Sequence, residues 1–165
     1  MNLIEIGEKL VDWLLTHRAK KSAQIDSYIR HIQMACRKLI EAEDPTSDKV
    51  SVLHEQLKVI YDLASSKLPT NFIEKEGWNL YRALSSARIY YWLRIVEKAD
   101  QNELAALFDD RQNKSSSFER LSSLLLATKD RTNKTILLEK LNIDEVRRIC
   151  LEDIAKLLEM RPFYS

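Results

Sequence analysis

The chain has 165 residues, and its 26 Lys and Arg against 25 Asp and Glu give a formal net charge of +1. Its apolar fraction of 45% and charged fraction of 31% are typical of a folded globular protein and exclude a disordered one. It holds only two glycines, Gly7 and Gly77, which argues against Gly-rich nucleotide loops and against sheets built on glycine turns.

The first two predicted helical segments keep one apolar phase across a polar gap. Apolar residues recur at helical spacing over residues 3–14, lapse over 16–24 and resume over 25–40. The segment 2–42 therefore forms either one long helix or two helices that meet near residues 20–22. A kink or loop is favoured, because about 40 residues far exceed the usual helix length.

The next two helices have clear start and stop signals. Residues 44–48 (DPTSD) form a breaker and N-cap cluster, and Pro69 ends the helix that follows. Asn71 with Glu74 predicts a capping box for a long helix that runs to about Lys98. This helix is apolar on two sides, so it is either central in a bundle or faces a partner.

Beyond residue 98 the predicted helices are short, and Asn142 with Glu145 opens the last of them. This change in helix length divides the chain into residues 1–98 and residues 99–165, which pack together or form a single domain. The predicted fold is all-α: an antiparallel bundle of long helices with a shorter-helix C-terminal portion.

No motif for catalysis, metal binding or a cofactor is present. None of the histidines His17, His31 and His54 lies three or four residues from another histidine or from a cysteine, so metal-ligand spacing is missing. Walker, Rossmann and nucleophile-elbow glycines are absent, and so is the Arg-x4–6-His motif of helical ribonucleases. We expect no enzyme activity, no metal and no cofactor.

The cysteines and the apolar runs bear on the compartment. Cys36 and Cys150 both continue apolar stripes, which predicts buried and reduced thiols. No apolar run approaches the roughly 18 residues of a membrane span, and the N-terminal residues do not resemble a signal peptide. We expect a cytoplasmic protein without a membrane segment.

A basic stretch between residues 16 and 40 is the strongest functional signal. On a helix, His31 and Lys38 share a face, and Arg30 and Arg37 lie beside it. Such a stripe can follow a phosphate backbone, or it can be a solvated face that pairs with acidic segments and contains an Asp26–Arg30 ion pair. The candidate contacts to nucleic acid or to an acidic partner are Arg18, Lys20, Lys21, Arg30, Arg37 and Lys38.

A second, weaker signal for nucleic acid lies at residues 141–148 (LNIDEVRR). A short helix, a tight turn at Asn142 and two arginines near the next helix start resemble a helix-turn-helix layout. The turn lacks the usual glycine, and two acidic residues would face the phosphates. Two capped antiparallel helices produce the same pattern and are favoured.

Aromatic residues crowd the long helix before residue 98. Tyr90, Tyr91 and Trp92 are consecutive and cannot all face one direction, so at least one is exposed or lies at an interface. The candidate interface residues on this helix are Trp78, Ile89, Tyr90, Leu93 and Val96.

These patterns predict a non-catalytic helical interaction module, a subunit or adaptor that binds a protein partner or a second copy of itself. The alternative is a helical nucleic-acid-binding accessory subunit, of the size and architecture found in prokaryotic ribonucleoprotein defence complexes, an analogy of architecture alone. A helical enzyme or an effector-neutralising immunity protein is a third hypothesis that the pattern does not separate from these two.

Overall fold

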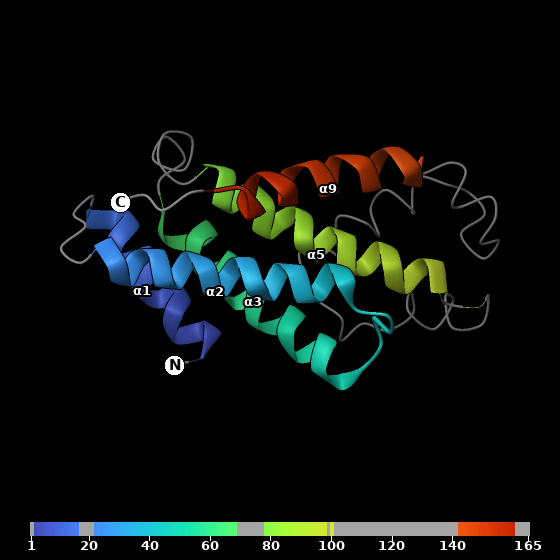
Figure 1. Ribbon diagram of the computed structural model, residues 1–165, viewed down its shortest axis with the longest axis horizontal. Coiled ribbons are helices and arrows are strands. Elements are labelled where there is room, and N and C mark those ends of the chain that lie inside the picture. Colours follow the sequence, from blue (N-terminus) through green and yellow to red (C-terminus); the bar gives the residue numbers. More distant parts are fainter. Residues whose placement is uncertain (1, 17–21, 69–77, 99, 101–141, 161–165) are drawn as a thin grey trace.

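A computed structural model of the chain describes residues 2–16, 22–68, 78–98, 100 and 142–160. Within these residues five helices pack against one another and no strand is present (Figure 1). They are α1 (Leu3–Thr16), α2 (Ser22–Glu41), α3 (Asp48–Lys67), α5 (Trp78–Lys98) and α9 (Ile143–Leu158). The predicted all-α class is confirmed.

Helix α5 is the central element of the described fold. It contacts α9, α3 and α2, so both of its apolar faces are covered by the chain itself (Figure 1). Ser86 and Glu97 of α5 pair with Asp153 and Arg147 of α9, an order that makes these two helices antiparallel. Of the predicted portion 99–165, the described residues include one helix, α9.

The start of α3 follows the sequence signal at residues 44–48. The Ser47 hydroxyl accepts a hydrogen bond from the Val50 amide at 3.4 Å and caps the helix. The Asp44 carboxylate accepts bonds from the amide and hydroxyl of Thr46 at 2.9 and 2.5 Å, and these bonds lower the pKa of Asp44. The helix ends at Lys67, shortly before Pro69.

Three other predicted boundaries have different outcomes. Helices α1 and α2 are separate, while the junction at residues 17–21 and the predicted capping box at residues 71–74 lie outside the described residues. The last helix begins directly after Asn142, as predicted, but no side-chain capping box forms there. Asn142 precedes α9 in the left-handed region, with φ 49°, and its side chain makes no cap bond, while the Glu145 carboxylate binds Arg148 instead. Asparagine tolerates this backbone better than most residues, which explains its place here.

The carboxyl end of α2 is capped by cations from α5. Arg94 donates to the carbonyl oxygens of Leu39 and Ile40, each at 3.3 Å, and to that of Ala42. Lys98 donates to the Glu43 carbonyl at 3.3 Å. The last carbonyls of a helix lack internal partners and carry negative partial charge, so Arg94 satisfies two of them, and Lys98 holds the segment that follows α2 against α5.

The thiols of Cys36 and Cys150 are both buried, as predicted. Burial raises the pKa of the Cys36 thiol to about 12. Since the thiolate is the reactive form, Cys36 is chemically inert at neutral pH.

A glycine of α1 lies directly against α3. A Cβ atom built on Gly7 would lie 2.5 Å from Cγ1 and 3.3 Å from Cβ of Ile60. Ile60 is 1% exposed and is held in the core, so it has little room to yield. Gly7 is therefore required by packing, although glycine is unfavourable in a helix.

We expect Gly7→Ala to lower the free energy of unfolding by about 1 kcal/mol. Overpacking costs about 1–3 kcal/mol, which exceeds the gain of roughly 1 kcal/mol in helix propensity. In an Ile60→Ala background the 2.5 Å contact with Cγ1 is removed and only Cβ, at 3.3 Å, remains close, so the same substitution should cost less. Urea denaturation of the four variants measures this coupling. Equal effects of Gly7→Ala in both backgrounds would show that the two side chains do not meet.

Candidate interaction surface

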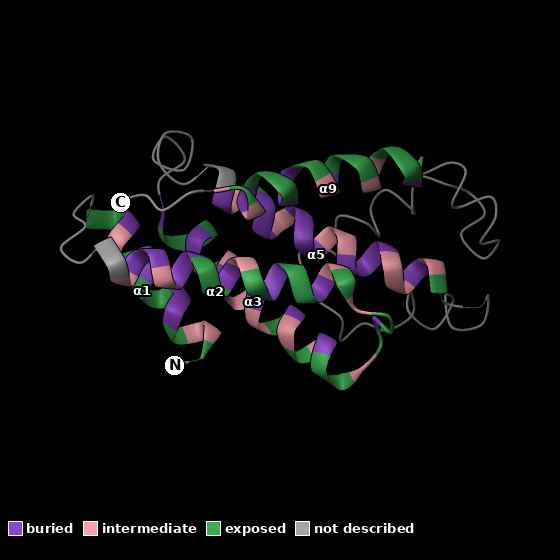
Figure 2. Ribbon diagram, in the orientation of Figure 1, coloured by how far each residue is buried: buried purple, intermediate pink, exposed green. Residues whose placement is uncertain are grey.

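The basic residues predicted to contact a partner divide into two groups. Arg30, Arg37 and Lys38 are exposed on α2, whose exposed and buried residues alternate along the helix in Figure 2. The other three, Arg18, Lys20 and Lys21, lie outside the described residues. The described part therefore brings three of the six predicted contacts onto one exposed helix.

These three cations have no internal ion pair among the described residues. The salt bridges of the described residues join other cations, such as Arg82, Arg88 and Arg147, to carboxylates within 4.0 Å. The predicted Asp26–Arg30 pair is not formed, because Asp26 is only 7% exposed whereas Arg30 points to solvent. Arg30, Arg37 and Lys38 thus form no ion pair within the part of the chain that the structure describes, and the exposed Glu41 lies one turn beyond Arg37 on the same side of α2.

An exposed methionine lies in the middle of these cations. Met34 is 56% exposed. It follows Arg30 by four residues and precedes Lys38 by four, so all of them project from one side of α2. We call Arg30, Met34, Arg37 and Lys38 the basic face of α2.

His31 borders this face, and its ring is held against the helix. Its Nδ1 atom lies 2.6 Å from the carbonyl oxygen of Ser27. A carbonyl oxygen can only accept, so Nδ1 carries the proton and donates it. This bond fixes the ring over the preceding turn, and Nε2 is the nitrogen that remains for an outside group.

The predicted interface residues of α5 lie mainly inside the chain. Leu93 and Val96 are each 1% exposed and belong to the core, since α5 is covered by its neighbours. Ile89 and Tyr90 are half-buried against the core, and an interface role for them stays a prediction. The side chain of Trp78 lies outside what the structure describes.

The arginines of the helix-turn-helix candidate are occupied by carboxylates. Arg148 binds Glu145 and Glu152 at 2.5 and 2.6 Å, and these bonds raise the pKa of Arg148. Arg147 binds Asp144 at 2.8 Å and also pairs with Glu97. Both cations are therefore committed to α9 and α5, which does not favour phosphate binding at residues 141–148.

A buried histidine that sequence reasoning did not single out lies between α3 and α5. His54 is 1% exposed, stacks on the Tyr91 ring at 4.0 Å and meets the Trp92 ring edge-on at 5.7 Å between centroids. Burial, followed by the charges of Arg88 and Lys58, lowers the pKa of His54 to about 3. The ring is therefore neutral at physiological pH, and its place on the stripe of Val50 and Leu57 was the signal for burial.

A fully buried arginine lies beside this histidine. Arg88 is 0% exposed, with its guanidinium 4.6 Å above the Tyr61 ring and 3.9 Å from the Asp62 carboxylate. The Tyr81 hydroxyl donates to that of Tyr61 at 3.1 Å. Burial lowers the pKa of Arg88, while the nearby Asp62 charge raises it. The cluster is closed to solvent at its centre, and its contacts join α3 to α5.

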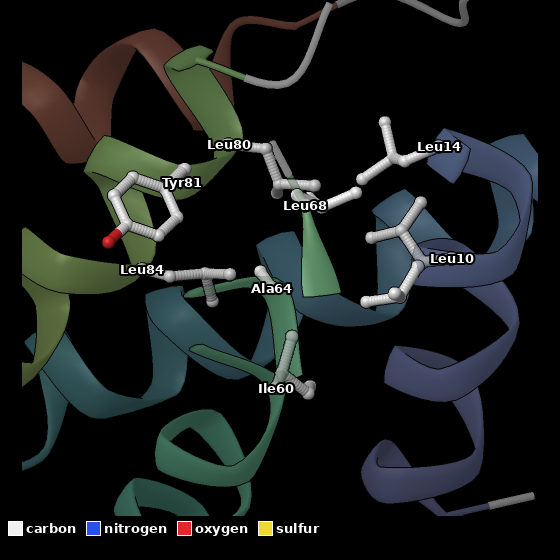
Figure 3. Close-up of a pocket in the computed structure, with 9 residues that line it drawn as sticks. Leu10, Leu14, Ile60, Ala64, Leu68, Leu80, Tyr81 and Leu84 are labelled. Atoms are coloured by element: carbon white, nitrogen blue, oxygen red, sulfur yellow. The ribbon is translucent and has the colours of Figure 1, made fainter. Parts of the chain in front are cut away.

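The small cavity in Figure 3 is not a ligand site. Leucines of α1 and α5 converge on it, together with Leu68 directly after α3, Ile60 and Ala64 of α3, and the ring of Tyr81 (Figure 3). Its volume is about 10 Å³, close to the minimum that one water molecule needs. Apolar cavities of this kind remain dry.

The described residues show neither a metal site nor a membrane span. No group of three or more His, Cys, Asp or Glu there is placed to hold a metal ion, and no helix there is long and apolar enough to cross a membrane. Comparison with protein-family models, with curated proteins and with solved structures found no match. The basic face of α2 is thus the strongest candidate for function.

The buried His54 predicts a dependence of stability on pH. Its folded pKa of about 3 lies below the unfolded value of about 6.5, so its contribution is complete above pH 6.5 and is lost as pH falls toward 3. We expect the wild type to lose about 2 kcal/mol between pH 7 and pH 5 relative to His54→Phe, since each pKa unit corresponds to about 1.4 kcal/mol. Urea denaturation of both proteins at both pH values cancels the contributions of other groups. An identical pH dependence for the two would mean that His54 is solvated.

Proposed function

We propose that this chain is a non-catalytic helical subunit or adaptor that binds an acidic protein partner through the basic face of α2. The observation that carries the proposal is the exposed Met34 within that face, flanked by Arg30, Arg37 and Lys38. Protein interfaces combine an apolar centre with a polar rim and are enriched in methionine and arginine. A partner that presents an apolar residue among carboxylates would match this arrangement.

The electrostatics support a protein partner. The three cations have no carboxylate partner among the described residues, so a partner's carboxylates could pair with them without breaking internal ion pairs. The net charge of +1 supplies little long-range attraction for a polyanion. Charge complementarity at this face would therefore act locally, on orientation and on rate of association.

Nucleic acid remains the second candidate, because the same exposed cations favour it. Arg30 to Lys38 span eight residue steps, or about 12 Å of helix at 1.5 Å per residue, enough to reach successive phosphates. Met34 would then have no role in affinity. The two candidates differ in their dependence on this one apolar side chain.

We expect Met34→Ala to weaken recovery of the partner about tenfold when the tagged chain is captured from its native host, which corresponds to about 1.4 kcal/mol. Arg37→Glu should abolish recovery, and nuclease digestion should have no effect. Val52→Ala is the matched control, since Val52 on α3 is also 56% exposed and lies outside the basic face.

Nucleic acid binding would reverse the expected effects of nuclease and of Met34→Ala on recovery. Recovery would then be abolished by nuclease and by Arg37→Glu, but would be unchanged in Met34→Ala. Recovery of the same protein by wild type and Arg37→Glu would contradict both candidates.

A further inference from the structure

Helix α1 presents an acidic counterpart to the basic face of α2. Glu5, Glu8 and Asp12 are exposed at positions i, i+3 and i+7, so they lie along one side of α1. Among the described residues no cation lies within 4.0 Å of any of these three carboxylates. Leu15, which is 43% exposed, lies one turn after Asp12. We call Glu5, Glu8, Asp12 and Leu15 the acidic face of α1.

The two faces border the same junction between helices. Helices α1 and α2 contact each other, and the ammonium of Lys9 lies 6.0 Å from the centre of the Tyr28 ring. On α1, Lys9 lies one turn from both Glu5 and Asp12, and on α2, Tyr28 lies one turn before His31, which borders the basic face. The acidic face of α1 and the basic face of α2 therefore lie on opposite sides of the junction between these two helices, and both are exposed.

The two faces also match in charge and length. Three carboxylates on α1 extend over about 10 Å, and three cations on α2 extend over about 12 Å, at 1.5 Å per residue. Each face adds one exposed apolar side chain, Leu15 or Met34. A two-fold interface must be self-complementary, and an acidic helix beside a basic helix on one surface meets that requirement.

We infer that the acidic partner is a second copy of this chain, related by a two-fold axis that sets the acidic face of α1 from each copy on the basic face of α2 from the other. This inference rests on the proposed function and names its partner. The net charge of +1 leaves little repulsion between copies. The partner captured by a tagged chain is then the untagged chain itself.

Charge reversal on one face at a time tests this arrangement. Arg30→Glu/Arg37→Glu makes both faces acidic, and Glu8→Lys/Asp12→Lys makes both basic. Sedimentation velocity at physiological salt should show a dimer for the wild type and monomers for each double variant alone. An equimolar mixture of the two variants should restore the dimer, because each acidic face then meets a basic one. All four positions are exposed, so unchanged circular dichroism will show that the variants are folded.

Three results would overturn the inference: a monomeric wild type, dimeric double variants, or a mixture that stays monomeric. A monomeric wild type that still captures another protein, with loss of capture in Met34→Ala, would leave the proposed function standing without this partner. A dimeric wild type that is insensitive to charge reversal on α2 would exclude both the basic face as the contact and the pairing inferred here.

Discussion

Helix α5 is apolar on two sides, and its burial requires other parts of the chain to cover both. The described structure meets this requirement with α9, α3 and α2. Leu93 and Val96, each 1% exposed, show how completely the helix is enclosed. An uncovered face of this kind would leave large apolar side chains in water, at a cost of about 1.5–3 kcal/mol for each one. The positions of the surrounding helices follow from this need.

Polar groups on α5 then determine how each neighbour is aligned. Ser86 donates to Asp153 of α9 at 2.8 Å, while Arg88 lies between the Tyr61 ring and the Asp62 carboxylate of α3. Arg94 satisfies the last carbonyls of α2. A buried polar group that loses its partner costs about 1–3 kcal/mol, so sliding any neighbour along α5 is disfavoured. Because α2 is held by its inner face and its carboxyl end, its outer face is left exposed in the described structure.

Much of this fold could be predicted from local signals. Hydrophobic periodicity predicts the helices, the DPTSD cluster predicts the start of α3, and the two apolar faces of α5 suggest its central place. The cap at Asn142 could not be predicted, because the choice between a side-chain cap and a left-handed backbone depends on how the chain enters α9. The burial of Arg88 also depends on tertiary structure, since an arginine is normally assigned to the surface and the Tyr61 ring comes from a distant segment.

The candidate surface was only partly predictable. The cations of α2 follow from sequence, but their lack of internal partners is a property of the folded chain. Met34 lies off the apolar stripe of α2, and this phase was a signal that it is exposed. The carboxylates of α1 carry no motif, and they become meaningful only because α1 and α2 are neighbours.

Native-state hydrogen exchange measures the central place of α5 most directly. If α5 is enclosed by α9, α3 and α2, the amides in its middle should exchange only through global unfolding, with the largest protection in the described helices. The same order of protection should hold in the monomeric Arg30→Glu/Arg37→Glu variant, because the cover of α5 comes from the same chain. Exchange of α5 at a lower free energy than that of α1 or α9 in this variant would show that the helix is instead covered by a partner.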